Sequence, residues 1–279
     1  MPNVNKNLCV SKTRIDDEFY TPYWVVEREL KNHNLIGKNI YCPFDDERSA
    51  FVQYLLNNFG SKEIGSVTYS SIDSKELVTV TEYHTKRTPL DSGDFNSPTI
   101  QELIRKKCFD LIITNPPFSL IEPFFKLLFE AEKRFVVLAS NIVISRKSLW
   151  PYYVDDKIKA SLYLHDESIM FDRPDGSQSD VSCTFWHNRD MIGPGFQNTG
   201  WRFDAMKYEF LANGCLFIRR WNKIPDDWFG LMAVPVNGAW RINREQFEIL
   251  GKCSGVPIIT PLGLDTGNRC FTRIIIRRK

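Results

Sequence analysis

The chain has 279 residues, of which 43% are hydrophobic and 25% are charged, and its formal net charge is +2. This is the composition of an ordinary soluble protein that can bury a sizeable core. The longest apolar runs are far too short for a membrane span, and residues 1–7 are too polar for a secretory signal, so we expect a cytoplasmic protein.

The spacing of the cysteines and histidines argues against a metal centre. The seven cysteines show no Cys-x-x-Cys spacing, and the four histidines are isolated along the chain. The sequence therefore suggests neither a disulfide framework nor a zinc site, and we assign no metal.

The first predicted element is a helix over residues 23–30. Thr21 is a candidate N-cap, Pro22 suits the first helical position, and apolar residues recur along one face. A Thr-Pro pair before a helix is often only a cap, so the pair alone leaves a binding role open.

Residues 37–43 predict the first strand of a sheet, followed by an acidic loop and a helix from about Ala50 to Phe59. In nucleotide-binding sheets this loop meets the ligand, because helix N-terminal amides collect there. Such loops are usually rich in glycine, but this one contains none. Asp45 and Asp46 either accept from a ligand's ammonium group or favour the helix N-terminus through its dipole.

Two further strands are predicted over residues 64–70 and 77–83, and residues 85–89 predict a turn. Cofactor-binding sheets often have a carboxylate at the end of the second strand to hold ribose hydroxyls. Here residues 68–71 carry hydroxyl groups instead, and either these hydroxyls or Asp73 are candidates for that role.

The most informative stretch is residues 109–118. The apolar residues 109–114 predict a strand buried on both faces, which ends at Asn115 because two prolines follow. Pro116 and Pro117 make the turn stiff, and Phe118 follows directly. An amide oxygen and a fixed carbonyl beside an aromatic ring suit an exocyclic amine, and they bind the positive charge that develops when it is methylated. The alternative is a turn whose prolines only end the strand.

A helix over residues 120–134, a strand over 135–139 and closing strands over 159–164 and 181–187 complete the predicted first domain. The connections predict a mostly parallel sheet whose strands end at one common edge. Residues 171–177 form either an exposed hairpin or a loop that approaches DNA.

From residue 191 a Gly-rich, linker-like segment marks a domain boundary. Residues 141–279 carry 19 Lys plus Arg against 15 Asp plus Glu, which is compatible with a polyanionic partner. Tryptophans alternate there with arginines, as a base-stacking and phosphate-binding surface requires, although most tryptophans serve small cores. These residues are Trp201, Trp221, Trp228, Trp240, Arg202, Arg219, Arg220, Arg241 and Arg244, and the basic end 273–279 is either a phosphate-contacting strand or a solvated terminus.

The Asn-Pro-Pro-Phe turn resembles the catalytic motif of amino-methylating enzymes that use S-adenosylmethionine. The order of residues 18–22, 40–46 and 115–120 is similar to that of the EcoRI-type adenine-specific DNA methyltransferase family, and the resemblance extends to residues 243–251 and 273–279. It implies catalytic roles for Asn115, Pro116, Pro117 and Phe118. It also implies contacts with S-adenosyl-L-methionine by Phe19, Tyr20, Thr21, Pro22, Pro43, Asp45, Asp46, Asp94 and Phe95, although Asp94 and Phe95 also fit a plain Ser-Gly-Asp turn.

We therefore expect an α/β fold, namely a Rossmann-like methyltransferase sheet (residues 1–190) with a smaller C-terminal target-recognition region (residues 191–279). The expected function is methylation of N6 of a flipped-out adenine in double-stranded DNA. The alternatives are methylation of cytosine N4, ribosomal RNA or protein, or a DNA-binding module with a degenerate cofactor pocket. A companion restriction system fits the resemblance, and we expect a monomer or a weak dimer.

Overall fold

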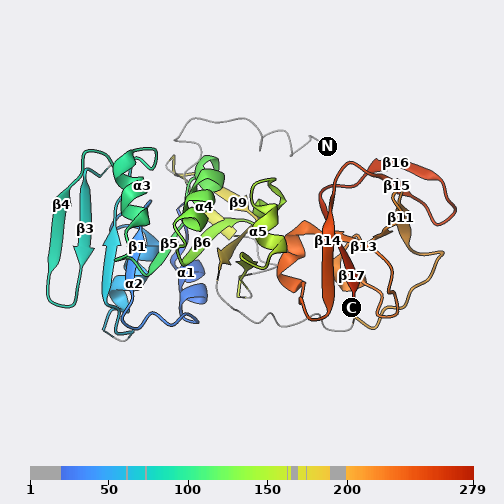
Figure 1. Ribbon diagram of the computed structural model, residues 1–279, viewed down its shortest axis with the longest axis horizontal. Helices are drawn as coiled ribbons and strands as arrows, with labels where there is room; N and C mark the ends of the chain where they lie inside the picture. Colours follow the sequence, from blue (N-terminus) through green and yellow to red (C-terminus); the bar gives the residue numbers. More distant parts are fainter. Residues whose placement is uncertain are drawn as a thin grey trace. The chain divides into compact units, whose positions relative to one another are not determined.

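A computed structural model describes residues 20–60, 62–72, 74–161, 163–164, 169–173, 175–188 and 199–279. The chain divides into two compact units, which are residues 1–140 with 163–189 and residues 141–162 with 190–279 (Figure 1). The expected division left residues 141–162 in the first domain, whereas the structure groups them with the C-terminal part.

The first unit is built on a sheet whose centre is parallel. Strand β1 pairs in parallel with β2 on one side and β5 on the other, and β5 pairs in parallel with β6. Antiparallel strands extend this centre at both ends. In spatial order the strands are β4 (Thr85–Pro89), β3 (Glu76–Val80), β2 (Ser66–Tyr69), β1 (Asn39–Cys42), β5 (Leu111–Thr114), β6 (Phe135–Ser140) and β10 (Cys183–His187).

Helices cover both faces of this sheet. Figure 1 shows α1 (Tyr23–Leu30) and α2 (Ala50–Asn57) along one face, with α3 (Pro98–Arg105) and α4 (Ile121–Glu130) along the other. The first pair shares a core cluster with fully buried sheet residues such as Ile40 and Ile113. An α/β fold with a parallel sheet centre confirms the predicted Rossmann-like class.

Two local predictions differ from the structure. Residues 85–89 were predicted as a turn, but they form β4, an exposed strand that pairs antiparallel with β3. Thr21 was predicted as the N-cap of the first helix, but Pro22 occupies that position and no side chain caps the helix. The bridging residues 171–177 include the end of β8 (Ile169–Asp172) and lead into β9 (Gln178–Val181), and the two strands pair as a hairpin.

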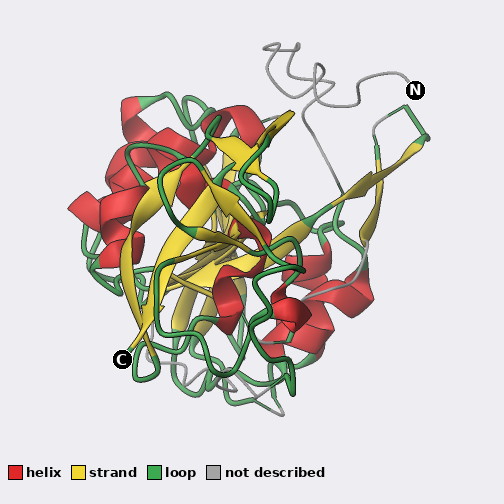
Figure 2. Ribbon diagram, turned by 90° about the vertical axis from the view of Figure 1, so that its right-hand side faces the viewer, coloured by secondary structure: helices red, strands yellow, loops and turns green. Residues whose placement is uncertain are grey.

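The second unit contains a sheet with mainly antiparallel pairing (strands yellow in Figure 2). Its order is β14 (Phe247–Cys253), β17 (Arg273–Arg278), β13 (Met232–Pro235), β12 (Leu216–Phe217), β11 (Glu209–Leu211), β15 (Pro257–Ile259) and β16 (Asp265–Arg269). The short elements of this unit are α5 (Trp150–Val154), β7 (Lys159–Ala160) and the 3₁₀ turns η4 (Val143–Ser145), η5 (Trp221–Lys223) and η6 (Val236–Arg241).

Residues 141–162 belong to the second unit because their side chains and carbonyls bond to it. The buried Tyr153 hydroxyl donates to the Ala239 carbonyl at 3.2 Å, and Arg244 donates back to the Tyr153 carbonyl. Lys252 donates to the Ser145 carbonyl. None of the helices in the described part of the chain combines the length and the hydropathy that crossing a bilayer requires.

Candidate active site

A cavity of about 450 Å³ opens at the carboxyl ends of β1, β2 and β5. The chain runs from β1 to β2 on one side and reaches β5 on the other, and ligands of open α/β sheets bind at such a switch point. The lining residues are Tyr20, Thr21, Phe44, Asp45, Asp46, Arg48, Ser49, Ala50, Phe51, Ser71, Ile72, Gly93, Asp94, Phe95, Asn115, Pro116, Pro117, Ser119 and Leu120.

Asp45, in the loop after β1, joins two walls of the cavity. It is 7% exposed and accepts hydrogen bonds from Ser49 Oγ at 2.5 Å and from Thr114 Oγ1 at 2.6 Å. Burial raises the pKa of Asp45 to about 6, although the two hydroxyl donors lower it, and the charge of Asp46 adds to the rise. Because Thr114 ends β5, this carboxyl group links the β1 loop to the Asn-Pro-Pro turn.

Asp46 and Arg48 present opposite charges together at the cavity. Arg48 Nη2 donates to Asp46 Oδ2 at 2.6 Å, and the Arg48 backbone N–H donates to Oδ1 at 2.8 Å. Partial burial raises the pKa of Asp46, but the hydrogen bonds and the charge of Arg48 outweigh it and hold the pKa below its ordinary value. A zwitterionic ligand could therefore pair with both groups.

Aromatic rings form another part of the wall. Phe44 and Phe95 line the cavity with ring centroids 5.7 Å apart, and both rings pack against Phe124 from α4. Such rings offer flat apolar surfaces to a purine.

The loop after β1 contains no glycine, but Gly93 lets the backbone before α3 approach the backbone after β2 closely. A Cβ added at Gly93 would lie 1.9 Å from the Ser71 carbonyl oxygen. The loop before α3 therefore packs directly on the loop after β2, which brings Asp94 and Phe95 to the cavity. The carboxylate of Asp94 accepts from the backbone and side-chain nitrogens of Asn96, at 3.0 and 3.1 Å.

The turn after β5 contributes Asn115, Pro116 and Pro117 to the same cavity. Asn115 Nδ2 donates to Thr21 Oγ1 at 3.2 Å, which fixes the orientation of the amide. Phe118, at the start of the 3₁₀ turn η3 (Phe118–Leu120), is not part of the lining; it is partly buried and packs against the core cluster of the sheet.

Nine of the predicted site residues thus line one cavity, namely Tyr20, Thr21, Asp45, Asp46, Asp94, Phe95, Asn115, Pro116 and Pro117. Pro22, Pro43 and Phe118 do not line it, and Phe19 and Asp73 lie outside the described residues. Their roles stay predictions. In the described part of the chain, His, Cys, Asp and Glu form no group of three that could hold a metal ion.

Sequence reasoning missed several residues at the cavity. Phe44 and Arg48 lie close in sequence to Asp45 and Asp46, and this proximity could have identified them as further lining residues. Ser49 lines the cavity and Thr114 does not, and the roles of both became visible only through their hydrogen bonds to Asp45. Gly93 lay in a turn whose contact with residue 71 no local pattern indicates.

Comparison with known proteins supplies the family. The family model described as adenine-specific methyltransferase EcoRI matches residues 62–201, about half of the chain. The type II methyltransferase M.EcoRI of Escherichia coli is 27% identical, over 99% of this chain and 97% of that protein. M.MgeORF184P of Mycoplasma genitalium is 25% identical over 96% and 98%, and M.MpnI of Mycoplasma pneumoniae is 24% identical over 96% and 97%.

No solved structure matches the chain. The match over half of the sequence, with relatives aligned along nearly their whole length, shows that the chain belongs to the EcoRI-type family of adenine-specific methyltransferases.

Proposed function

We propose that the chain transfers a methyl group from S-adenosylmethionine to N6 of a flipped-out adenine in double-stranded DNA. The observation that carries this proposal is that the Asn115-Pro116-Pro117 turn lines the same cavity as a set of acidic and aromatic side chains. The description of the matching family, an adenine-specific methyltransferase, agrees with adenine as the acceptor base.

Other residues that line the cavity suit the parts of S-adenosylmethionine. Asp46 and Arg48 would pair with its ammonium and carboxylate groups, and Asp45 adds a buried carboxyl group beside the partly buried Asp46. Phe44 and Phe95 would hold its adenine ring. The cavity, at about 450 Å³, lies in the size range of small-molecule sites. When bound there, the cofactor supplies a methyl group on a sulfonium centre.

The turn acts on the acceptor amine. Asn115 Nδ2 donates to Thr21 Oγ1, which fixes the amide plane. In this proposal the Asn115 amide oxygen and the Pro116 carbonyl are the acceptors for the incoming amine. As the amine nitrogen attacks the methyl group it becomes positively charged, and these fixed acceptors bind that charge more strongly than the neutral amine. Extrusion of the base from the duplex costs about a few kcal/mol, which contacts in the closed complex must offset.

The proposal is tested with methyl-labelled S-adenosylmethionine offered with duplex DNA, RNA or protein. We expect label on N6 of adenine in DNA alone. Label on cytosine N4, on RNA or on protein would replace the proposed acceptor by that alternative. A chain that transfers no methyl group and shows no heat of S-adenosylmethionine binding would be a DNA-binding module with a degenerate pocket.

A further inference from the structure

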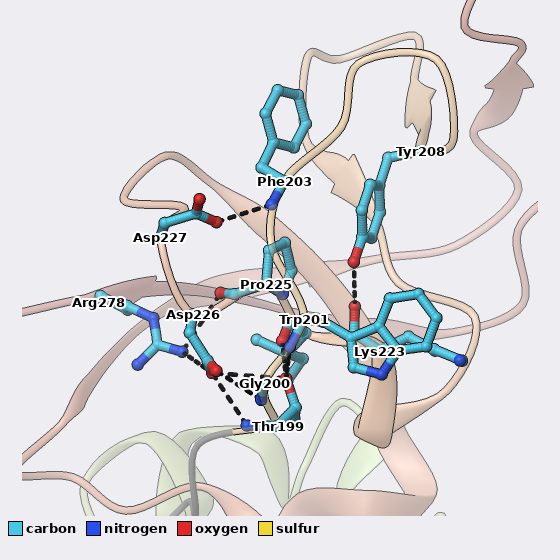
Figure 3. Close-up of polar contacts among 11 residues, drawn as sticks. Thr199, Gly200, Trp201, Phe203, Tyr208, Lys223, Pro225, Asp226, Asp227 and Arg278 are labelled. Atoms are coloured by element: carbon cyan, nitrogen blue, oxygen red, sulfur yellow. Dashed lines mark hydrogen bonds and ion pairs between the residues drawn. The ribbon is translucent and has the colours of Figure 1, made fainter.

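The 3₁₀ turn η5 of the second unit is held rigidly from several sides. Trp221 is 8% exposed and its indole N–H donates to the Pro235 carbonyl at 3.0 Å. Gly238 lies against this indole so closely that an added Cβ would be 1.6 Å from its nitrogen. The Tyr208 hydroxyl donates to the Lys223 carbonyl at 2.9 Å (Figure 3). The turn therefore keeps one conformation at little further entropic cost on binding.

The segment that begins at Thr199 supports the same turn. Thr199 Oγ1 donates to the Ile224 carbonyl at 2.6 Å, and the Gly200 N–H donates to the Asp226 carboxylate at 2.7 Å. The Asp226 N–H donates back to the Trp201 carbonyl at 2.8 Å. Figure 3 shows the contacts of Gly200 and Trp201 meeting at Asp226, which also faces Arg278 at 3.5 Å.

Trp201 positions the ammonium group of Lys223. Lys223 Nζ lies 3.2 Å from the centroid of the indole ring, and Trp201 is 41% exposed. A cation held over an indole face keeps its charge while its side chain loses freedom. Lys223 is thus presented in a fixed place beside an exposed aromatic ring.

The turn carries cations that no carboxylate of the described residues neutralises. Many exposed basic side chains of the second unit face a carboxylate, as Arg202, Lys207, Arg219, Arg269 and Arg277 do. Within the described ranges, Arg220 and Lys223 have no carboxylate within ion-pair distance. Arg220 and Asn222 are exposed on either side of the buried Trp221.

We propose that η5 and Arg220 before it form the sequence-reading turn of this enzyme. Arg220 and Asn222 would contact base edges in the major groove, where arginine pairs with guanine and asparagine with adenine. Lys223, held on Trp201, would contact a phosphate and fix the register. Arg220 and Lys223, two cations without a carboxylate partner among the described residues, complement a polyanion. The inference rests on the proposed function, in which the polyanion is duplex DNA.

The test uses the full chain with Arg220→Ala, Asn222→Ala or Lys223→Ala. The matched control is Arg277→Ala, which removes an exposed arginine of the same unit that is paired with Glu248. Each protein is expressed in a host without adenine methylation of its own, and sequencing maps N6-methyladenine in the host DNA. Duplexes carrying the wild-type motif then give the salt dependence of binding, and thermal unfolding checks that each variant is folded.

Arg220→Ala and Asn222→Ala should each relax the motif at one base pair, where discrimination falls about 5- to 150-fold. Should either variant lose methylation, its preference for the motif duplex over a scrambled duplex should fall by the same factor. Lys223→Ala should keep the motif and lower the log–log salt slope by about one. The control should change neither.

The possible failures are distinguishable. A wild-type chain that methylates one motif, with folded variants that keep its discrimination and its salt slope, would overturn the inference alone. A wild-type chain that leaves host DNA unmethylated would overturn the proposed function and the inference with it.

Discussion

Replacing Asp45 by Asn should stabilise the protein at neutral pH, because the buried carboxyl group is costly to ionise. The pKa of Asp45 is about 6 in the folded chain, against an ordinary value of 3.8. The folded state therefore holds this proton more tightly than the unfolded state. The stability that the folded state gains by holding this proton is fully present below about pH 4. This stability is lost as the pH rises through about 6. Two pKa units correspond to about 3 kcal/mol.

Denaturant unfolding of the two proteins without cofactor, from pH 4 to pH 8, measures this difference. The free energy of unfolding of Asp45→Asn, relative to the wild type, should rise by about 3 kcal/mol across this range. Other titrating groups are common to both proteins and cancel in the comparison.

Asp46→Asn is the matched control, because the pKa of Asp46 itself is held below the ordinary value. That carboxylate contributes stability above its ordinary pKa of 3.8 and loses it as the pH falls through its lower folded pKa. The relative stability of Asp46→Asn should therefore change little between pH 4 and pH 8 and should not rise with pH. A relative stability of Asp45→Asn that stays flat, or that falls with rising pH, would refute the reasoning.

Three further outcomes are expected. Asn115→Ala should abolish methyl transfer while calorimetry shows cofactor binding largely intact; full activity would contradict its assignment. Gly93→Ala should weaken cofactor binding and lower the unfolding temperature, because the new Cβ meets the Ser71 carbonyl, whereas Gly60→Ala enters open space and should change neither. Phe118→Ala should lose about 1–3 kcal/mol of binding to DNA with an unpaired target adenine, measured by fluorescence anisotropy; unchanged affinity would leave Phe118 as a core residue only.

The central strands of the first unit were predictable because burial leaves a clear pattern. The apolar runs at residues 37–43 and 109–114 contain β1 and β5, and the paired prolines mark where β5 ends. β4 was missed for the opposite reason. Its five residues are all exposed, and it is a strand because β3 offers its edge for hydrogen bonding, which local sequence does not encode.

The site was predictable where one motif carries several of its residues. Asn115, Pro116 and Pro117 are consecutive, so the amino-acid sequence alone identifies the turn. It does not identify the partner of Asp45, because Thr114 is 69 residues away and has the pattern of an ordinary strand residue. The role of Phe118 stays a prediction, because its partly buried side chain packs on the core cluster and does not line the cavity.

β4 also determines how the sheet of the first unit ends. β4 is the edge strand of this sheet, and another extended chain can pair with the outer backbone groups of such a strand. Lys86 and Arg87 place charge along it, Arg87 is tied to Glu76 at 3.0 Å, and Pro89 removes a donor at its end. An incoming strand would have to bury these charges and leave a carbonyl without a partner, so the side chains of β4 themselves oppose the addition of another strand.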